Sequence, residues 1–139
     1  MLYNMNLSKN FTLDELTNSA TAKAKDFKEQ FNPSFGIVKN LEKLAINILQ
    51  PLRDLWDNPI SVNCAYRCAR LNQAVGGVAS SQHLQGKAAD ITAGDIATNT
   101  KLFKLLEDLP YDQRIFEQGG KWIHVSYDET RNRKQTLFL

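Results

Sequence analysis

The chain has few of the features that mark disulfide-stapled, membrane-spanning or disordered proteins. Its 139 residues include only two cysteines, four prolines and seven glycines, and 42% of them are hydrophobic. There is no low-complexity tract or internal repeat, and no apolar run approaches the length that crosses a bilayer. We therefore expect one soluble domain over residues 1–139 with its own core and no membrane insertion.

The charge is nearly balanced, which argues against a nucleic-acid partner. Seventeen basic and fifteen acidic side chains give a net charge of +2, and the basic residues are scattered. One short basic run, RNRK at 131–134, could meet an anionic surface such as a nucleic acid or a bacterial wall polymer, but a solvated turn is the simpler interpretation. We expect no nucleic-acid partner and a monomeric chain.

The N-terminal segment and the cysteines both indicate a cytoplasmic site of synthesis. The segment MLYNMNLSKN has no basic stretch followed by an apolar run of signal-peptide length. Cys64 and Cys68 fit a reducing compartment as free thiols. Their C-x3-C spacing offers half of a zinc site, but no second Cys or His pair lies nearby in the sequence. We therefore interpret both as buried structural cysteines.

Helical patterns dominate the first half of the chain. The segment TLDE at 12–15 is a capping box and predicts a short helix. Apolar residues at helical spacing over 37–56 predict the main core helix, kinked or restarted near Pro51. The alternating segment 60–63 predicts a strand, and a short helix is expected from about residue 69 to the glycines at 76–77.

Strand patterns dominate the second half. Residues 88–92 are expected to be extended, and a helix is expected over 96–109. Residues 114–118 and 121–127 flank Gly119-Gly120, which is a strong β-hairpin signal because glycine accepts the positive φ angles of tight turns. The sequence thus predicts an α+β domain, with helices packed on a small, mainly antiparallel sheet.

The chain contains only two histidines, His83 and His124. Alternation places His124 on one strand face with Trp122 and Ser126, although a lone strand histidine is more often a structural residue. If the hairpin loop has two or four residues, Glu117 pairs with Trp122 and its side chain shares a face with His124. A three-residue loop would break this register and leave Glu117 as a strand-end charge.

Asp90 lies among small and apolar residues, where an unpaired carboxylate is costly to bury. It needs a partner, either backbone amides or a cation. Two histidines and one aspartate form a three-ligand set that leaves one zinc position open for water, as catalytic zinc sites require. The same set describes the facial triad of non-haem iron(II) oxygenases, so these ligands alone do not select the metal.

Several segments together resemble the zinc D-Ala-D-Ala carboxypeptidase family, which has the hedgehog/DD-peptidase fold. Residues 81–90 match its signature S-x-H-x-x-G-x-A-x-D, and Trp-Ile-His at 122–124 is similar to its second metal motif. Ala-Tyr-Arg at 65–67, followed by Leu-Asn and Gly-Gly, resembles a run in bacterial and phage members. Residues 10–16 resemble their N-terminal segment, so the resemblance covers nearly the whole chain.

The resemblance implies that His83, Asp90 and His124 bind one Zn²⁺ ion and that a nearby glutamate is the general base. The carboxypeptidases and the vancomycin-resistance dipeptidases usually carry this acid three residues before the second histidine, where this chain has Lys121. Other members resemble D-x-x-I-x-E as it stands at 112–117, so Glu117 is the predicted base.

Asp112 and Asp128 remain weaker candidates for the base. The resemblance further implies that Arg67 binds a substrate carboxylate or stabilises the developing oxyanion, and that Ser81 binds the same end of the substrate. Without the resemblance, Arg67 would be interpreted as a surface ion pair and Ser81 as a loop cap.

The implied reaction is hydrolysis of a peptide bond in peptidoglycan by zinc-activated water, with Glu117 passing the proton to the leaving amine. The bond is either a D-Ala-D-Ala terminus or an L-Ala-D-Glu-type bond within the stem peptide. By analogy with phage lysis enzymes, such an endolysin would act on the cell wall after release. The alternative is a non-catalytic, metal-containing wall-binding module of the same fold. An iron oxygenase is disfavoured because the usual H-x-D spacing is absent.

Overall fold

The computed structural model describes residues 5–139. The first four residues of the predicted domain and of the segment MLYNMNLSKN lie outside the described residues. The α-helices are α1 (Leu13–Thr17), α2 (Ala20–Ala24), α3 (Phe35–Leu44), α4 (Gln50–Trp56), α5 (Ala69–Ala74) and α6 (Ile96–Leu105). Shorter helical turns are η1 (Lys28–Phe31), η2 (Ala45–Leu49), η3 (Gln82–Gln85) and η4 (Leu106–Asp108). The strands are β1 (Ser61–Cys64), β2 (Ala88–Thr92), β3 (Gln113–Glu117), β4 (Trp122–Ser126) and β5 (Gln135–Phe138).

The strands form one mixed five-stranded sheet in the order β1-β2-β4-β3-β5. The pairs β1–β2, β2–β4 and β3–β4 are antiparallel, whereas β5 runs parallel to β3. The predicted α+β class with a mainly antiparallel sheet is confirmed. The edge strand β5 was not predicted, because its burial does not alternate along the strand and its place depends on the chain returning beside β3.

The predicted core helix over 37–56 is present but interrupted. Its apolar side packs into the core, with fully buried leucine and isoleucine side chains at Leu41, Leu44, Ile48, Leu49 and Leu52. The turn η2 just before α4 is π-helical, and Pro51 follows near the start of α4. Since proline lacks an N–H and its ring crowds the preceding turn, a wider turn at this point accommodates it. The interruption expected near Pro51 is confirmed.

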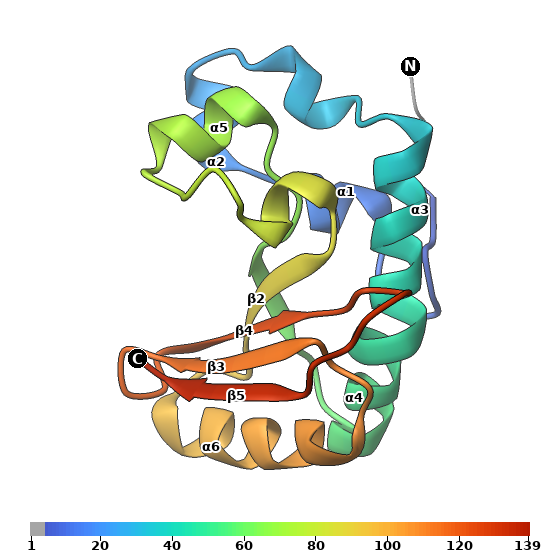
Figure 1. Ribbon diagram of the computed structural model, residues 1–139, viewed down its shortest axis with the longest axis vertical. Coiled ribbons are helices and arrows are strands. Elements are labelled where there is room, and N and C mark those ends of the chain that lie inside the picture. Colours follow the sequence, from blue (N-terminus) through green and yellow to red (C-terminus); the bar gives the residue numbers. More distant parts are fainter. Residues whose placement is uncertain (1–4) are drawn as a thin grey trace.

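The sheet has one apolar and one polar face around the site. Helix α6 covers one face, while the other is turned towards α5 and η3 (Figure 1). On β4, Ile123 and Val125 are fully buried and belong to the same core cluster as Leu102 of α6. The intervening Trp122 and His124 therefore lie on the opposite face. Within the described part of the chain, no helix is long and apolar enough to span a membrane.

The β3–β4 hairpin has the register that the sequence predicts for a four-residue loop. Glu117 pairs with Trp122, and Ile115 pairs with His124. The loop residues Gln118, Gly119 and Gly120 all have positive φ. Because directly paired residues of antiparallel strands project to the same side, Glu117 lies on the face of His124.

Candidate active site

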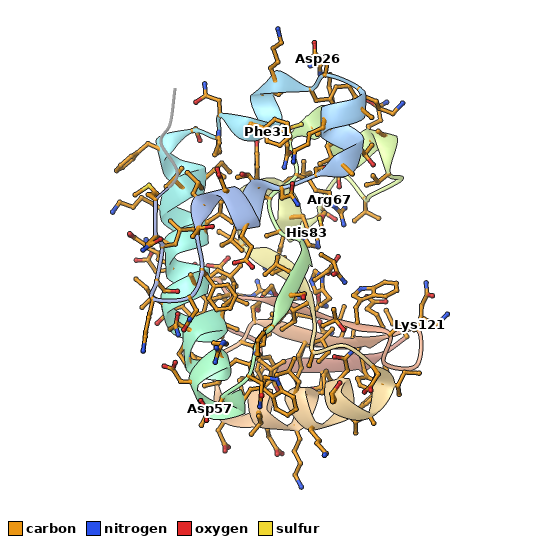
Figure 2. The ribbon with its side chains drawn as sticks, turned by 180° about the vertical axis from the view of Figure 1, so that it is seen from behind. Asp26, Phe31, Asp57, Arg67, His83 and Lys121 are labelled. Atoms are coloured by element: carbon orange, nitrogen blue, oxygen red, sulfur yellow. The ribbon has the colours of Figure 1, made fainter. Side chains whose placement is uncertain are left out.

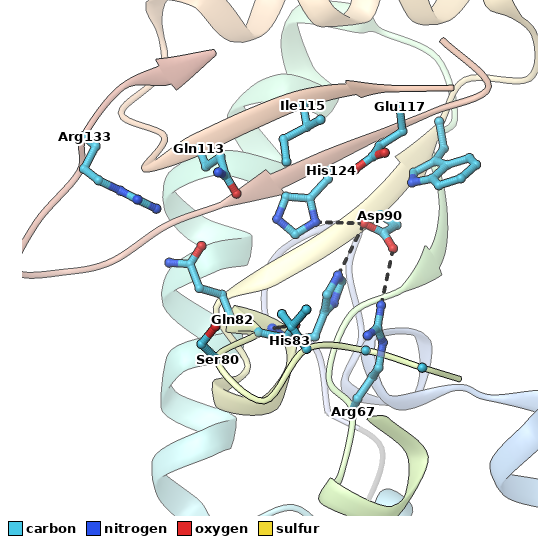
Figure 3. A pocket seen from close by; sticks show the side chains of 15 residues that line it. Arg67, Ser80, Gln82, His83, Asp90, Gln113, Ile115, Glu117, His124 and Arg133 are labelled. Carbon is cyan, nitrogen blue, oxygen red and sulfur yellow. Dashed lines mark hydrogen bonds and ion pairs between the residues drawn. The ribbon is translucent and has the colours of Figure 1, made fainter. Parts of the chain in front are cut away.

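A pocket of about 560 Å³ opens on the polar face of the sheet. It is lined by strands β2, β3 and β4, by the loop before η3 and by the segment between β1 and α5 (Figure 3). The six residues that the sequence singles out all line it, namely Arg67, Ser81, His83, Asp90, Glu117 and His124. Segments more than fifty positions apart in the printed sequence thus contribute to one site.

Asp90 lies between the two histidines. Its Oδ1 is 3.1 Å from Nδ1 of His124 and 3.3 Å from Nε2 of His83 (Figure 3). Strand pairing sets the first contact, because Asp90 and His124 are direct partners across β2 and β4. The two imidazole rings approach edge to face, with centroids 5.1 Å apart. One nitrogen of each histidine therefore lies within 3.3 Å of the same Asp90 oxygen.

The two distances from Asp90 to the histidine nitrogens are compatible with ligands of one tetrahedral zinc ion. Ligand atoms that lie about 2.0–2.1 Å from zinc are about 3.3 Å from one another in a tetrahedron. The 3.1 Å and 3.3 Å separations agree with this value. In addition, Nδ1 of His83 is 2.6 Å from the carbonyl oxygen of Ala65, an outer contact that leaves Nε2 free to bind the metal. Zinc would thus be held by Nε2 of His83, Nδ1 of His124 and the Asp90 carboxylate.

Asp90 and His83 shift each other's pKa. Burial raises the pKa of Asp90, but hydrogen bonds from His124 and His83 outweigh this effect and lower the pKa below its usual range. Burial lowers the pKa of His83, but the hydrogen bonds with Asp90 and Cys64 and their charges raise it to about 9. A metal ion needs the neutral imidazole, so its binding displaces this proton.

Cys64 also lies close to the cluster, which its spacing from Cys68 did not indicate. Ligand atoms of Cys64, His83 and Asp90 all lie within 4.8 Å of one another. However, the Cys64 sulfur faces Nδ1 of His83 at 3.9 Å, whereas Asp90 faces Nε2. Among the described residues, His124 is not part of this group of mutually close ligand atoms. One ion cannot bind both edges of the His83 ring, so Cys64 and Asp90 approach different ring nitrogens. Both cysteines are free thiols, as expected.

The segment 81–90 positions His83 and Asp90 through its small and turn-forming residues. The Ser81 hydroxyl accepts a hydrogen bond from the backbone N–H of His83 at 3.2 Å and caps η3. Gly86 ends η3 with φ +70°, and a Cβ there would lie 3.0 Å from the Ile37 carbonyl oxygen. Ala88 and Ala89 are completely buried. These small residues allow the backbone to pack closely behind His83 and Asp90.

Arg67 is held inside the pocket, so its interpretation as a surface ion pair is wrong. Its side chain is only 15% exposed, and Nη2 lies 3.9 Å from Oδ2 of Asp90. Nη1 donates to Oδ1 of Asn72 at 2.9 Å, and Nε donates to the Cys64 sulfur at 3.2 Å. A Cβ at Gly77 would collide with Asn72 and lie 2.7 Å from Nη1 of Arg67. The Leu-Asn and Gly-Gly run thus serves to place this guanidinium.

Glu117 is the acid best placed to act as a base. Its half-buried side chain projects into the pocket on the His124 side of the sheet (Figure 3). Among residues 5–139 its carboxylate has no hydrogen-bond partner. Lys121, three residues before His124, is exposed at the tip of the hairpin (Figure 2).

The two competing acids are engaged elsewhere. Asp112 is buried, and its carboxylate accepts hydrogen bonds from Arg133 and Gln82. Asp128 accepts from Lys87 and from Thr130 and does not line the pocket. An acid already bound by cations and donors is a poor proton acceptor.

The pocket residues that were not identified from the sequence include Gln82, Gln113 and Arg133. Gln113 lies four residues before Glu117 on β3. Because side chains alternate along a strand, the sequence could have placed Gln113 on the same face as Glu117. Gln82 precedes His83 directly, but nothing in the sequence predicts which way its side chain points. Arg133 belongs to the basic run at 131–134, and only the path of the loop before β5 brings it to the pocket.

Comparisons with known proteins identify the family of this chain. A model of the family described as Peptidase M15 matches residues 9–126, which is most of the chain. The chain therefore belongs to the peptidase M15 family, and the predicted resemblance is confirmed. It is also 45% identical over 47 residues to the zinc D-Ala-D-Ala carboxypeptidase of Streptomyces albus G. That alignment covers 33% of this chain but only 18% of the relative.

Proposed function

We propose that this protein is a zinc metallopeptidase that hydrolyses a peptide bond in the stem peptides of peptidoglycan. The observation that carries the proposal is the contact of Asp90 with both His83 and His124 in a pocket that also holds Glu117 and Arg67. Peptidase M15 membership and the similarity to a zinc carboxypeptidase support it.

The proposed roles follow from the chemistry of each group. Zinc, when bound, supplies Lewis acidity that makes water a better nucleophile near neutral pH and polarises the scissile carbonyl. Glu117 accepts the proton of the attacking water and passes it to the leaving amine. Arg67 lies next to Asp90, where its planar guanidinium can bind a carboxylate of the substrate or the developing oxyanion. Ser81 accepts a hydrogen bond from the backbone N–H of His83 and lines the same pocket, where it is proposed to bind the same end of the substrate.

Two bonds in peptidoglycan suit this arrangement. A D-Ala-D-Ala terminus has a free carboxylate on the residue after the scissile bond. The D-glutamate that follows an L-Ala-D-Glu bond is linked onward through its side chain, so its α-carboxylate is free in the same position. Arg67 can bind either group. The Streptomyces albus relative is named for the first reaction.

The experiment is a digest of defined peptides by the zinc-loaded protein. We expect cleavage at one of the two bonds, detected by mass spectrometry, to stop on chelation and to return when zinc is restored. The second candidate function, a wall-binding module without catalysis, predicts that the same peptides bind but remain intact. Glu117 in the pocket favours the enzyme, because binding alone does not require an unpaired base.

A further inference from the structure

Arg133 brings a second guanidinium to the pocket. It lies on the loop between β4 and β5, within the basic run at 131–134. In Figure 3, Arg133 and Arg67 lie on either side of the group formed by His83, Asp90 and His124. The reacting bond must lie next to this group if the proposed function is correct. The two arginines therefore flank the position of the scissile bond.

The guanidinium of Arg133 is held in a fixed orientation. Its Nε donates to Oδ1 of Asp112 at 2.9 Å, and its Nη2 donates to Oδ2 of the same carboxylate at 3.0 Å. The backbone N–H of Arg133 also donates to Oδ1, and Gln82 donates to Oδ2. Asp112 is only 3% exposed, so the carboxylate that accepts these hydrogen bonds is buried within the fold. A bidentate contact of this kind fixes the plane of the arginine.

The same contact leaves part of the guanidinium available to a ligand. The Arg133 side chain is 40% exposed. Across the described residues, its Nη1 has no hydrogen-bond partner. Nη1 carries two N–H groups. Nη2 carries one more N–H group in addition to the one that donates to Asp112. An arginine whose only task was to neutralise Asp112 would not need to line the pocket with these donors.

The other basic residues of the run do not share this arrangement. Lys134 donates to the backbone carbonyls of Glu107 and Leu109, at the end of η4. Arg131 is exposed and does not line the pocket that holds the zinc ligands. The run is therefore not one anionic-polymer surface, and Arg133 alone points to the site.

We propose that Arg133 determines substrate specificity by binding a second carboxylate, on the side of the scissile bond opposite to the group bound by Arg67. This inference rests on the proposed function. It defines the substrate class as peptides that carry an anionic group on both sides of the bond that is cut. Stem peptides meet this condition where acidic residues or diamino acids with a free carboxylate lie on each side of a cleavable bond.

The test compares two peptides that differ only in this second group, a carboxylate in one and a carboxamide in the other. For zinc-loaded wild-type protein we expect kcat/KM to favour the carboxylate by about tenfold, since a charge-assisted hydrogen bond replaces a neutral one. Arg133→Gln keeps a donor for Asp112 and should cleave both peptides at similar rates. The matched control is Arg131→Gln, which removes the same charge two residues away and should retain the tenfold preference.

The design separates a binding role from a structural one. A variant that is merely destabilised loses activity towards both peptides equally, so the ratio of the two rates is unchanged. Arg133→Lys, which keeps a positive charge beside Asp112, serves if Arg133→Gln does not fold, and it should lower the preference. The inference is overturned if the wild type and the Arg133 variants prefer the carboxylate peptide to the same extent. It is also overturned if Arg131→Gln loses this preference as fully as Arg133→Gln does.

Failure of the proposed function gives a different result, in which wild-type protein cleaves neither peptide. In that case the same two peptides are titrated calorimetrically against the zinc-loaded protein. A carboxylate preference in Kd that Arg133→Gln abolishes supports Arg133 as the reader of the carboxylate. Equal Kd values for the two peptides refute it.

Discussion

Glu117→Gln is the change that most directly tests the chemistry of the site. The substitution keeps the shape of the side chain and its hydrogen-bonding capacity but removes the basic oxygen. Glu117 pairs with Trp122 at the end of β3, so the new amide remains on the His124 face of the sheet. None of the three zinc ligands is altered. We therefore expect the variant to fold and to hold zinc as the wild type does.

The expected loss is roughly 10²-fold or more in kcat, because general base catalysis contributes about 10²- to 10⁴-fold. A 10²-fold loss corresponds to about 3 kcal/mol of transition-state stabilisation. KM should change much less, since Arg67 and the zinc ligands, and not Glu117, are proposed to bind the ground state.

The assay is steady-state cleavage of a stem peptide at equal zinc occupancy, measured by elemental analysis of the same samples. Equal occupancy matters because His124→Ala would also abolish activity by removing a ligand. Glu107→Gln, an exposed glutamate on η4, is the matched control and should be fully active. Asp128→Asn should also have little effect, because Asp128 is engaged by Lys87. Near wild-type turnover by Glu117→Gln would refute the assignment of the base and require another group to move the proton.

Three further predictions concern the metal, the thiols and the buried acid. Zinc affinity, measured by competition with a chelator, should rise with pH up to about 9, because binding must displace a proton from His83, whose pKa is raised to about 9; a pH-independent affinity would contradict this. Cys68→Ala and Cys64→Ala should each retain about one zinc per chain by elemental analysis, but only Cys64→Ala should lower activity, because it removes the sulfur that accepts a hydrogen bond from Arg67. Burial raises the pKa of Asp112, but hydrogen bonds from Arg133 and Gln82 outweigh this and lower it from 3.8 to about 2. The folded pKa is depressed, so Asp112 stabilises the fold above pH 3.8 and this stability is lost as the pH falls to about 2. In urea titrations, Asp112→Asn should therefore remove about 1–2 kcal/mol of unfolding free energy above pH 3.8, and progressively less as the pH falls to about 2; this figure allows for the partial exposure of Arg133.

The conformation of segment 81–90 and the hairpin register were predictable because they depend on local rules. The segment 81–90 contains its own cap, its left-handed glycine and its small buried residues, so its conformation follows from neighbours a few positions away. The hairpin register follows from Gly119-Gly120 and strict alternation. Such signals can be seen in the sequence without knowing where the rest of the chain lies.

The features that were missed depend on contacts between segments that lie far apart in the sequence. Strand β5 has no alternating pattern, and only the pairing with β3 makes it a strand. Cys64 lies beside His83 because the irregular β1–β2 register sets Cys64 opposite Asp90. Arg133 reaches the pocket because the loop before β5 lies along Asp112. None of these contacts can be predicted from the spacing of residues within a single segment.

The position of Arg133 links the missed edge strand to the chemistry. The backbone N–H of Gln135, the first residue of β5, donates to the carbonyl of Asp112, and the Asp112 carboxylate accepts from the backbone N–H of Arg133. Pairing of β5 with β3 therefore places the arginine beside the buried acid that orients it. An edge strand of this kind contributes little to the core, since its two ends are exposed. Its main consequence for function is that it brings a second cation to the side of the pocket opposite Arg67.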